Sequence, residues 1–310
     1  MSPPEDFDAF WQQTLAEARA RGGAVKAERV TDRYLLSTVD VDDVRFPGWN
    51  GEPVAAWLLR PRGAEGPLPV VVTYLGYCAG RGLPTDHLLW SAAGYGQLVV
   101  DSRVRATPPP DHSGGDGTQW VEGFMTRGID SPHNHYYRRL MTDCVRAVDA
   151  IAELPGLDAG RVIVAGGSQG GGLALAVGGL VPDRVAAVLA DVPFLCHFRH
   201  AARTSGDGPY LELAKYLRRH SPHRVEATFA TLDYFDGVHF ALRAKAPALF
   251  SVGLMDPTCP PPTVYAAFNH YAGVDRTMTA WPFADHGDGF GFNTAEQLKW
   301  LRERGLAPRQ

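Results

Sequence analysis

The stretch from Arg161 to Gly172 reads RVIVAGGSQGGG, and it decides the fold. Its first five residues form an apolar run typical of a buried strand, and the small-residue segment 170–180 is typical of a helix. Between the two lies Gly-x-Ser-x-Gly, centred on Ser168. Glycines are needed in such a tight turn because side chains would collide with neighbouring backbone. The stretch therefore predicts a nucleophile elbow, which raises the Ser168 hydroxyl above the carboxyl end of a sheet.

The segments on both sides of this stretch continue the alternation of strand and helix. Apolar runs predict strands, and apolar residues at helical spacing predict helices. Apolar strands that alternate with helices indicate an α/β protein, with a mostly parallel central sheet and helices on both faces. The expected strands are 35–41, 53–59, 69–75, 97–101, 161–165, 184–191, 246–252 and 276–281, and the expected helices are 6–20, 136–154, 170–180, 262–271 and 294–304.

The spacing of these elements predicts one domain over residues 1–310. A helical and strand-forming extension occupies about 1–60. The segment of about 192–245 follows the strand that ends at Asp191, and it is too long for a plain crossover. We expect it to be a helical insertion that caps one edge of the sheet. The segment 102–134 has little periodicity, and we expect a long functional loop there.

Composition excludes several classes of protein. The 310 residues carry a formal net charge of −4, so there is no basic field to hold nucleic acid or anionic lipid. No apolar run approaches the ~18 residues of a membrane span. The acidic opening MSPPEDFDAFWQQ does not resemble a signal peptide. The four widely spaced cysteines suggest buried free thiols, so we expect a cytoplasmic protein without disulfides.

The acid and base that would serve Ser168 follow from chain order, which in this fold is Ser, acid, His. His286 lies in a flexible segment after the last expected strand, whereas His270 lies within a helix. Asp256 follows the strand 246–252. The alternative acid, Asp191, precedes Pro193 and resembles a loop-capping carboxylate. We therefore expect Asp256 to orient His286, which takes the Ser168 proton.

Two further inferences concern the surroundings of the serine. The backbone N–H of Gln169 begins the expected helix and points where an oxyanion would form. Metal binding is not expected, because no histidine pair has a third ligand at zinc-site spacing. No cofactor is expected either. The histidine pairs considered are His133/His135, His197/His200 and His220/His223.

Longer segments carry a resemblance to one known family. They are the opening FDAFWQQTL, the turn Gly76-Tyr77, GFMTRGI, YYRRLMTDCVRAVDAI, GGSQGGG, DVPFLCHF, YFDGV and PALFSVGLMD. Together they resemble the acetyl xylan esterase/cephalosporin C deacetylase family, carbohydrate esterase family 7, over almost the whole chain.

The resemblance implies an α/β-hydrolase that deacetylates sugars, such as xylo-oligosaccharides, and small esters such as cephalosporin C. It implies the triad Ser168, Asp256 and His286, and an oxyanion hole from the N–H groups of Tyr77 and Gln169. It also implies an acyl pocket near Phe194, Pro209 and Thr258. Its members form hexamers whose inner chamber admits small substrates, so a homo-oligomer is expected.

The chain departs from the family at two motifs. Arg103-Val104-Arg105 stands where the family has Arg-Gly-Gln, and His286-Gly287 stands where it has His-Glu. Thr258 replaces a branched apolar residue. Three alternatives remain open at this point: a broad carboxylesterase, a deacetylase dedicated to one natural product, and a non-catalytic binding module on a hydrolase fold.

Overall fold

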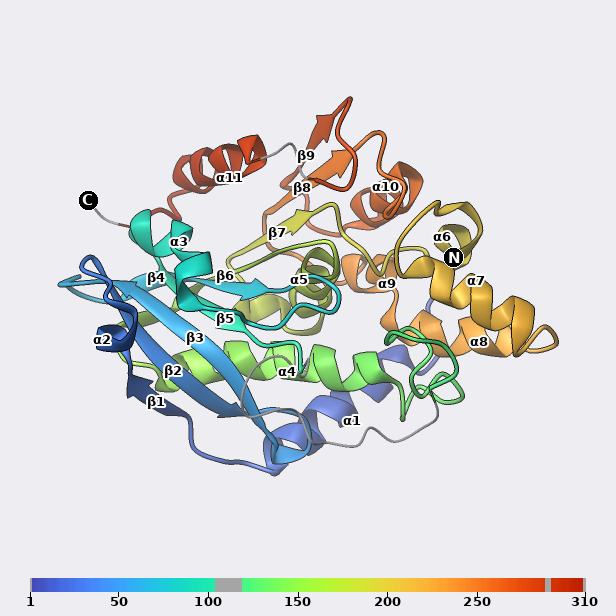
Figure 1. The fold of residues 1–310 in the computed structure, drawn as a ribbon, viewed down its shortest axis with the longest axis horizontal. Coiled ribbons are helices and arrows are strands. Elements are labelled where there is room, and N and C mark those ends of the chain that lie inside the picture. Colours follow the sequence, from blue (N-terminus) through green and yellow to red (C-terminus); the bar gives the residue numbers. More distant parts are fainter. Residues whose placement is uncertain (1, 104–118, 288–290, 309–310) are drawn as a thin grey trace.

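A nine-stranded sheet organises the part of the chain that the computed structural model describes, residues 2–103, 119–287 and 291–308 (Figure 1). From β5 to β9 neighbouring strands are parallel, and β1, β2, β3 and β5 pair antiparallel. The expected mostly parallel sheet is confirmed. In spatial order the strands are β1 (Lys26–Arg29), β2 (Val39–Pro47), β3 (Pro53–Pro61), β5 (Gly96–Val100), β4 (Leu68–Tyr74), β6 (Leu157–Gly167), β7 (Ala187–Asp191), β8 (Ala248–Gly253) and β9 (Arg276–Trp281).

Helices cover both faces of this sheet, as the sequence predicts. Alternate residues of a strand point to opposite faces, so Val70 and Val72 of β4 join the larger core while Val71 joins a second one. The larger core contains α1, α4, α5, α9 and α10, and the second contains α3 and α11. The helices are α1 (Phe7–Ala20), α2 (Thr31–Tyr34), α3 (Leu89–Ala92), α4 (Tyr136–Ala150), α5 (Gln169–Leu180), α6 (Phe198–Thr204), α7 (Tyr210–Arg219), α8 (Val225–Leu232), α9 (Gly237–Ala241), α10 (Pro261–His270) and α11 (Phe292–Glu303).

The expected insertion contains the four helices α6 to α9. The short helix α9 packs against α5, and α7 lies beside the segment that follows β4 (Figure 1). The ring of Tyr210 in α7 lies 4.3 Å from that of Phe194, which follows β7. The insertion thus lies beside the carboxyl ends of central strands, where α/β folds place their binding sites.

The described residues of the expected loop 102–134 have no regular secondary structure. Residues 119–135 contain turns and bends but no helix or strand, and residues 104–118 lie outside the described part of the chain. Arg103, the first residue of the altered motif, donates from Nη2 to Asp143 Oδ1 at 3.0 Å and also pairs with Glu52. This residue therefore ties the end of β5 to α4 and to the turn before β3.

Composition predicts neither a membrane-spanning helix nor a disulfide. No helix in the described residues is long and apolar enough to cross a membrane. All four cysteines are unpaired, as expected. Cys78, however, is exposed, so the expectation of buried thiols is wrong for that residue. The cause is its place in the Gly-rich turn after β4, which lies at the surface rather than under a helix.

Candidate active site

Ser168 occupies the strained turn that its glycines predict. Its backbone has φ +56° and ψ −118° directly before α5, a left-handed conformation that is costly for a residue with a side chain. Its N–H donates to the Asp191 carbonyl oxygen at 2.9 Å. A Cβ on Gly166 or Gly170 would lie closer than 3.0 Å to the Tyr74 carbonyl oxygen. The two glycines therefore allow strand β4, the elbow and helix α5 to approach one another.

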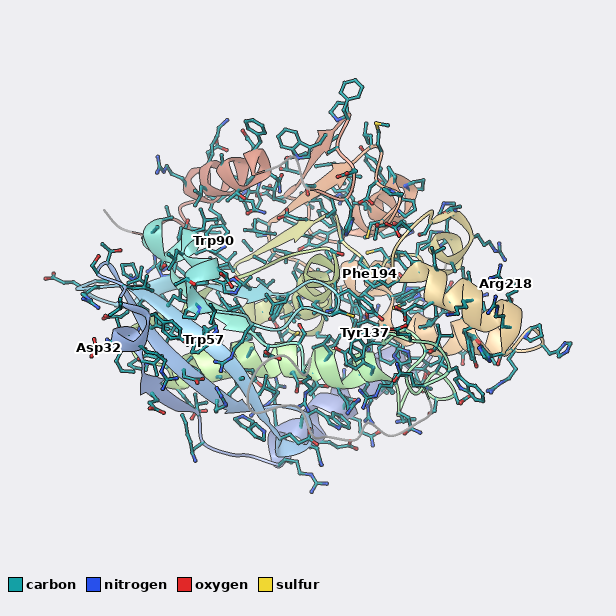
Figure 2. The ribbon with its side chains drawn as sticks, in the orientation of Figure 1. Asp32, Trp57, Trp90, Tyr137, Phe194 and Arg218 are labelled. Carbon is teal, nitrogen blue, oxygen red and sulfur yellow. The ribbon has the colours of Figure 1, made fainter. Side chains whose placement is uncertain are left out.

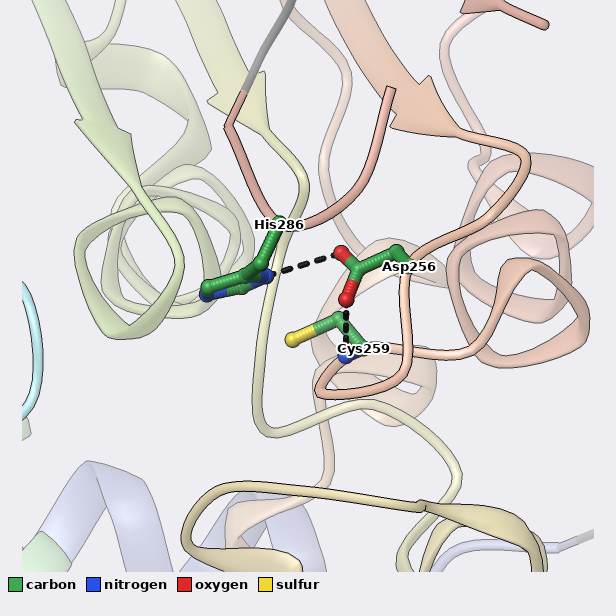
Figure 3. A group of neighbouring side chains, drawn as sticks. All are labelled: Asp256, Cys259 and His286. Atoms are coloured by element: carbon green, nitrogen blue, oxygen red, sulfur yellow. Dashed lines mark hydrogen bonds and ion pairs between the residues drawn. The ribbon is translucent and has the colours of Figure 1, made fainter. Parts of the chain in front are cut away.

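A continuous line of hydrogen bonds joins Ser168, His286 and Asp256. His286 Nε2 lies 2.9 Å from Ser168 Oγ, and its Nδ1 lies 2.8 Å from Asp256 Oδ2. Figure 3 shows the second of these contacts. Asp256 Oδ1 accepts the N–H groups of Thr258 and Cys259, each at 2.8 Å. The buried carboxylate is thus held on both oxygens, and the imidazole bridges it to the hydroxyl.

The two alternatives from chain order lie elsewhere. Asp191 accepts from Asn293 Nδ2 and Gln297 Nε2, each at 2.6 Å, so its side chain anchors α11. His270 is exposed on α10 and hydrogen-bonds the Ala266 carbonyl within its own helix. The hydrogen bonds of these two side chains therefore lead to α11 and α10. The structure therefore brings Asp256 and His286, rather than Asp191 and His270, to the serine.

Two backbone N–H groups stand beside the elbow. Among the described residues, neither the Tyr77 nor the Gln169 N–H donates to a backbone acceptor. The Gln169 side chain connects the two segments: its Nε2 lies 3.3 Å from the carbonyl oxygens of Leu75 and Gly76. Its Oε1 accepts from the Tyr137 hydroxyl of α4 at 3.0 Å. Two N–H groups that find no backbone acceptor among the described residues suit a developing oxyanion.

The three residues expected to form an acyl pocket come from neighbouring segments. Phe194 N–H donates to the Ser168 carbonyl at 2.9 Å, and its buried ring lies 6.0 Å from that of Tyr77. Phe194 and Tyr137 both lie in the interior (Figure 2). Thr258 is nearly buried and packs against the position of Gly208, directly before Pro209. All three therefore lie close to the elbow or to Asp256.

Potential metal ligands also gather here, although the sequence pointed to none. In the described residues, the one group of three such side chains comprises Asp256, Cys259 and His286. Each already has a role: both Asp256 oxygens accept hydrogen bonds, and His286 bridges Asp256 and Ser168. Burial raises the pKa of the Cys259 thiol well above its usual value, so it stays protonated. The group fits a hydrogen-bonded triad with a thiol packed beneath it.

Within the part of the chain that the structure describes, the histidine pairs belong to no such group. His135 caps α4 by accepting the Tyr137 N–H on its Nδ1, and His220 stacks on Tyr216 of α7. The rings of His197 and His200 lie 5.4 Å apart.

Sequence reasoning missed one residue of this region, Glu212. Its carboxylate on α7 accepts the Tyr77 hydroxyl at 2.9 Å, and the two residues are 135 positions apart in the chain. Burial raises the pKa of Glu212 to about 7. A single glutamate in an amphipathic helix carries no signal of such a contact, since most face solvent.

Comparisons with known proteins agree with this geometry. The family model described as acetyl xylan esterase matches residues 1–304. An acetyl esterase, Axe7A of Xylanibacter ruminicola, is 29% identical over 311 residues, which cover 97% of this chain and 67% of the relative.

Solved structures are similar over nearly the whole chain. An acetyl xylan esterase from Paenibacillus sp. R4 is 36% identical with a TM-score of 0.91, covering 98% of this chain and 96% of the other. Acetyl xylan esterase 1 from Thermoanaerobacterium sp. JW/SL YS485 is 31% identical with a TM-score of 0.88, covering 97% and 94%. An acylaminoacyl peptidase from Pyrococcus horikoshii, 16% identical with a TM-score of 0.61, shares the fold alone. The chain therefore belongs to the acetyl xylan esterase family and is a carboxylic ester hydrolase with the α/β-hydrolase fold.

Proposed function

We propose that the chain removes acetyl groups from acetylated xylo-oligosaccharides and related small esters, cephalosporin C among them, through the triad Ser168–His286–Asp256. The observation that carries the proposal is the continuous hydrogen-bonded line from Asp256 Oδ2 through His286 to Ser168 Oγ, at 2.8 and 2.9 Å. The relatives of the chain include an acetyl esterase and two acetyl xylan esterases, which supports acetylated sugars as the substrate class.

In the first half of the reaction, Ser168 Oγ attacks the acetyl carbonyl carbon while His286 Nε2 takes the hydroxyl proton. The carbonyl oxygen becomes an oxyanion that accepts the N–H groups of Tyr77 and Gln169. The C–O bond to the sugar then breaks. The sugar oxygen leaves with the proton from His286, and acetyl-Ser168 remains.

The second half repeats these roles with water. His286 Nε2 takes a proton from a water molecule, whose oxygen attacks the acetyl-Ser168 carbonyl. Collapse of the second oxyanion returns the proton to Ser168 Oγ and releases acetate. Throughout, Asp256 stabilises the imidazolium and keeps Nε2 directed at the serine, because its other oxygen is fixed by two backbone N–H groups.

The acyl group is proposed to sit between Phe194, Pro209 and Thr258. Phe194 is buried and held between the rings of Tyr77 and Tyr210, so it has little room to move. Residues 205–209 are tied to 257–258, since the N–H of Gly206 donates to the Pro257 carbonyl at 2.8 Å. Phe194 on one side and the joined segments 205–209 and 257–258 on the other would form a rigid acyl wall. A rigid wall supports selection of small acyl groups.

Acyl-chain length tests this proposal. Each methylene that fitted would contribute about 0.8 kcal/mol of burial, whereas overpacking a closed pocket costs roughly 1–3 kcal/mol. The clash dominates, so kcat/KM should fall about 5- to 150-fold from p-nitrophenyl acetate to the butyrate.

The same assay distinguishes the other candidates. Equal or rising kcat/KM from acetate through butyrate to hexanoate would contradict the deacetylase and favour a broad carboxylesterase, with Thr258 leaving the wall open. Absence of turnover on every one of these esters would contradict the proposed function. A panel of acetylated sugars and cephalosporin C then identifies the alcohol part of the substrate.

Assembly, partners and location in the cell are further predictions for this chain. The resemblance implies a homo-oligomer, a hexamer in the family, and a small acetylated molecule as the partner. A cytoplasmic location is expected as well. Neither nucleic acid nor a membrane surface is an expected partner, given the net charge of −4.

A further inference from the structure

Three segments far apart in the sequence meet at the hydroxyl of Tyr77. Glu212 of α7 accepts this hydroxyl with both oxygens, at 2.9 and 3.0 Å. The same hydroxyl accepts the N–H of Phe124. Glu212 Oε2 also accepts the N–H of Met125 at 3.2 Å. The insertion, the segment after β4 and the segment before α4 are therefore joined through one carboxylate.

The junction is closely packed. A Cβ on Gly123 would lie closer than 3.0 Å to the Glu212 carboxylate, so the chain passes directly against it. The rings of Tyr77 and Phe124 are 5.8 Å apart, and Phe124 stacks on Tyr136 of α4 at 4.6 Å. A carboxylate in this setting restricts the Tyr77 side chain and, with it, the backbone that bears the Tyr77 N–H.

The two proposed oxyanion donors are thus held in different ways. Gln169 N–H belongs to the first turn of α5, and its position follows from the helix. Tyr77 N–H belongs to a Gly-rich turn with no regular structure of its own. The Gln169 side chain restrains that turn at Leu75 and Gly76. The side chain of Tyr77 itself is held at its hydroxyl, which donates to the Glu212 carboxylate.

We infer that Glu212 is a positioning residue for catalysis: as a carboxylate it anchors the Tyr77 hydroxyl and thereby holds the Tyr77 N–H at the oxyanion. The inference rests on the proposed role of Tyr77 in the oxyanion hole. It makes the insertion part of the catalytic apparatus, because α7 supplies the anchor. Displacement of a catalytic group by about 1 Å is enough to reduce turnover about 100-fold.

Protonation should disable this anchor. A carboxylate can accept from both the Tyr77 hydroxyl and the Met125 N–H, whereas the neutral acid gives up one of its acceptor oxygens to a proton. Burial raises the pKa of Glu212 to about 7; Tyr77 and the Met125 N–H favour the carboxylate, Glu122 opposes it, and Lys215 on the same helix favours it. Among the described residues, Cys78 and Tyr137 also interact electrostatically with Glu212. The anchor is therefore complete above pH 7 and lost as the pH falls.

The test compares Glu212→Gln and Tyr77→Phe with wild type, using steady-state hydrolysis of p-nitrophenyl acetate at pH 8. Each variant should lower kcat about 10- to 100-fold with little change in KM. The double variant should be about as slow as either single variant, because both remove one interaction. Glu212→Asp, which keeps a carboxylate, should recover part of the loss. Glu226→Gln, an exposed glutamate on α8 paired with Arg199, is the matched control and should not alter kcat.

The pH profile separates positioning from mere structural support. In wild type, protonation of Glu212 should remove the anchor, so kcat should show a fall of about 10- to 100-fold as the pH drops through about 7. This fall should be absent in Glu212→Gln, which has no carboxylate to protonate. The same pH profile in the two enzymes, kcat within about twofold of wild type, or additive effects of the two substitutions would overturn the inference. If Glu212→Gln fails to fold, Tyr77→Phe alone decides, since it removes only a hydroxyl.

Failure of this inference is distinguishable from failure of the proposed function. If Ser168 becomes acetylated in wild type while Glu212→Gln turns over normally, only the anchor is wrong. If Ser168 is never acetylated, the proposed function itself is wrong.

Discussion

Asp191 ends β7 and Asp256 follows the adjacent strand β8, and the two carboxylates have different partners: Asp256 hydrogen-bonds His286, whereas Asp191 accepts from α11. Chain order favoured Asp256 because the acid follows the serine and precedes the histidine. The structural role of Asp191 could not be predicted from the sequence, because the side chains that donate to its carboxylate, Asn293 and Gln297, lie about a hundred residues later in the chain. The anchor at Glu212 was missed for the same reason, since its partner Tyr77 is 135 residues away. Motif residues could be predicted, but their supporting contacts could not.

Substitution of the two aspartates to asparagine should therefore have opposite consequences. Asp256→Asn disturbs the tautomer of His286 and should lower kcat about 10⁴-fold in a folded protein. Asp191→Asn places a donor opposite the Asn293 and Gln297 amides, so it should lower the free energy of unfolding by about 1–3 kcal/mol and leave most of kcat. Kinetics together with urea unfolding measure both. An inactive, stable Asp191→Asn beside an active Asp256→Asn would reverse the assignment.

At the scale of elements, prediction succeeded where burial imposes a pattern. The apolar run 161–165 lies within β6, and the helix expected at 6–20 is α1 (Phe7–Ala20). Strand β1 was not foreseen because its sequence, KAER, is fully exposed and has no apolar alternation. The strand expected at 35–41 begins only at Val39, since Leu35 has φ +54° and ends the short helix α2. Exposed edge elements depend on pairing with a neighbour, which composition alone does not reveal.

Helix α5 provides a test at this scale. Its Gly172 lies so close to the Phe194 carbonyl oxygen that an added Cβ would be nearer than 3.0 Å. The backbone N–H groups of Gly172 and Phe194 both donate to the Ser168 carbonyl, so neither segment can easily move away. Gly172→Ala should therefore lower the free energy of unfolding by about 1–3 kcal/mol and should disturb the proposed acyl wall at Phe194. Gly206→Ala is the control, because its Cβ would meet Pro257 at an ordinary 3.6 Å. Equal stability of the two variants in urea titrations would contradict this view of the packing.

The whole molecule combines a sheet predicted from alternation with an insertion whose helix α7 contacts Tyr77 through Glu212. Exposed apolar side chains gather near the His286 segment: Met255 and Phe283 are 64% and 90% exposed, and Met255 N–H donates to the Ala284 carbonyl. Phe292, 69% exposed, lies beside Trp281 at the end of β9. Clustered exposed apolar side chains are typical of association surfaces. They support the homo-oligomer expected from the family resemblance.

Light scattering at micromolar concentration tests this expectation. The mass should be a multiple of the 33.7 kDa chain, and a hexamer would agree with the family resemblance. A monomeric mass would contradict it, and the exposed side chains near β9 would then need another explanation.

The central claim is that Ser168 carries the acetyl group between the sugar and water. The most direct measurement is a rapid quench of the enzyme with p-nitrophenyl acetate, followed by peptide mass spectrometry. We predict one acetyl group on the peptide that contains Ser168, none in Ser168→Ala, and turnover reduced about 10⁴-fold or more in that variant. Acetylation confined to another residue, such as the exposed Cys78, or a Ser168→Ala variant with more than roughly a few per cent of wild-type activity, would contradict the claim.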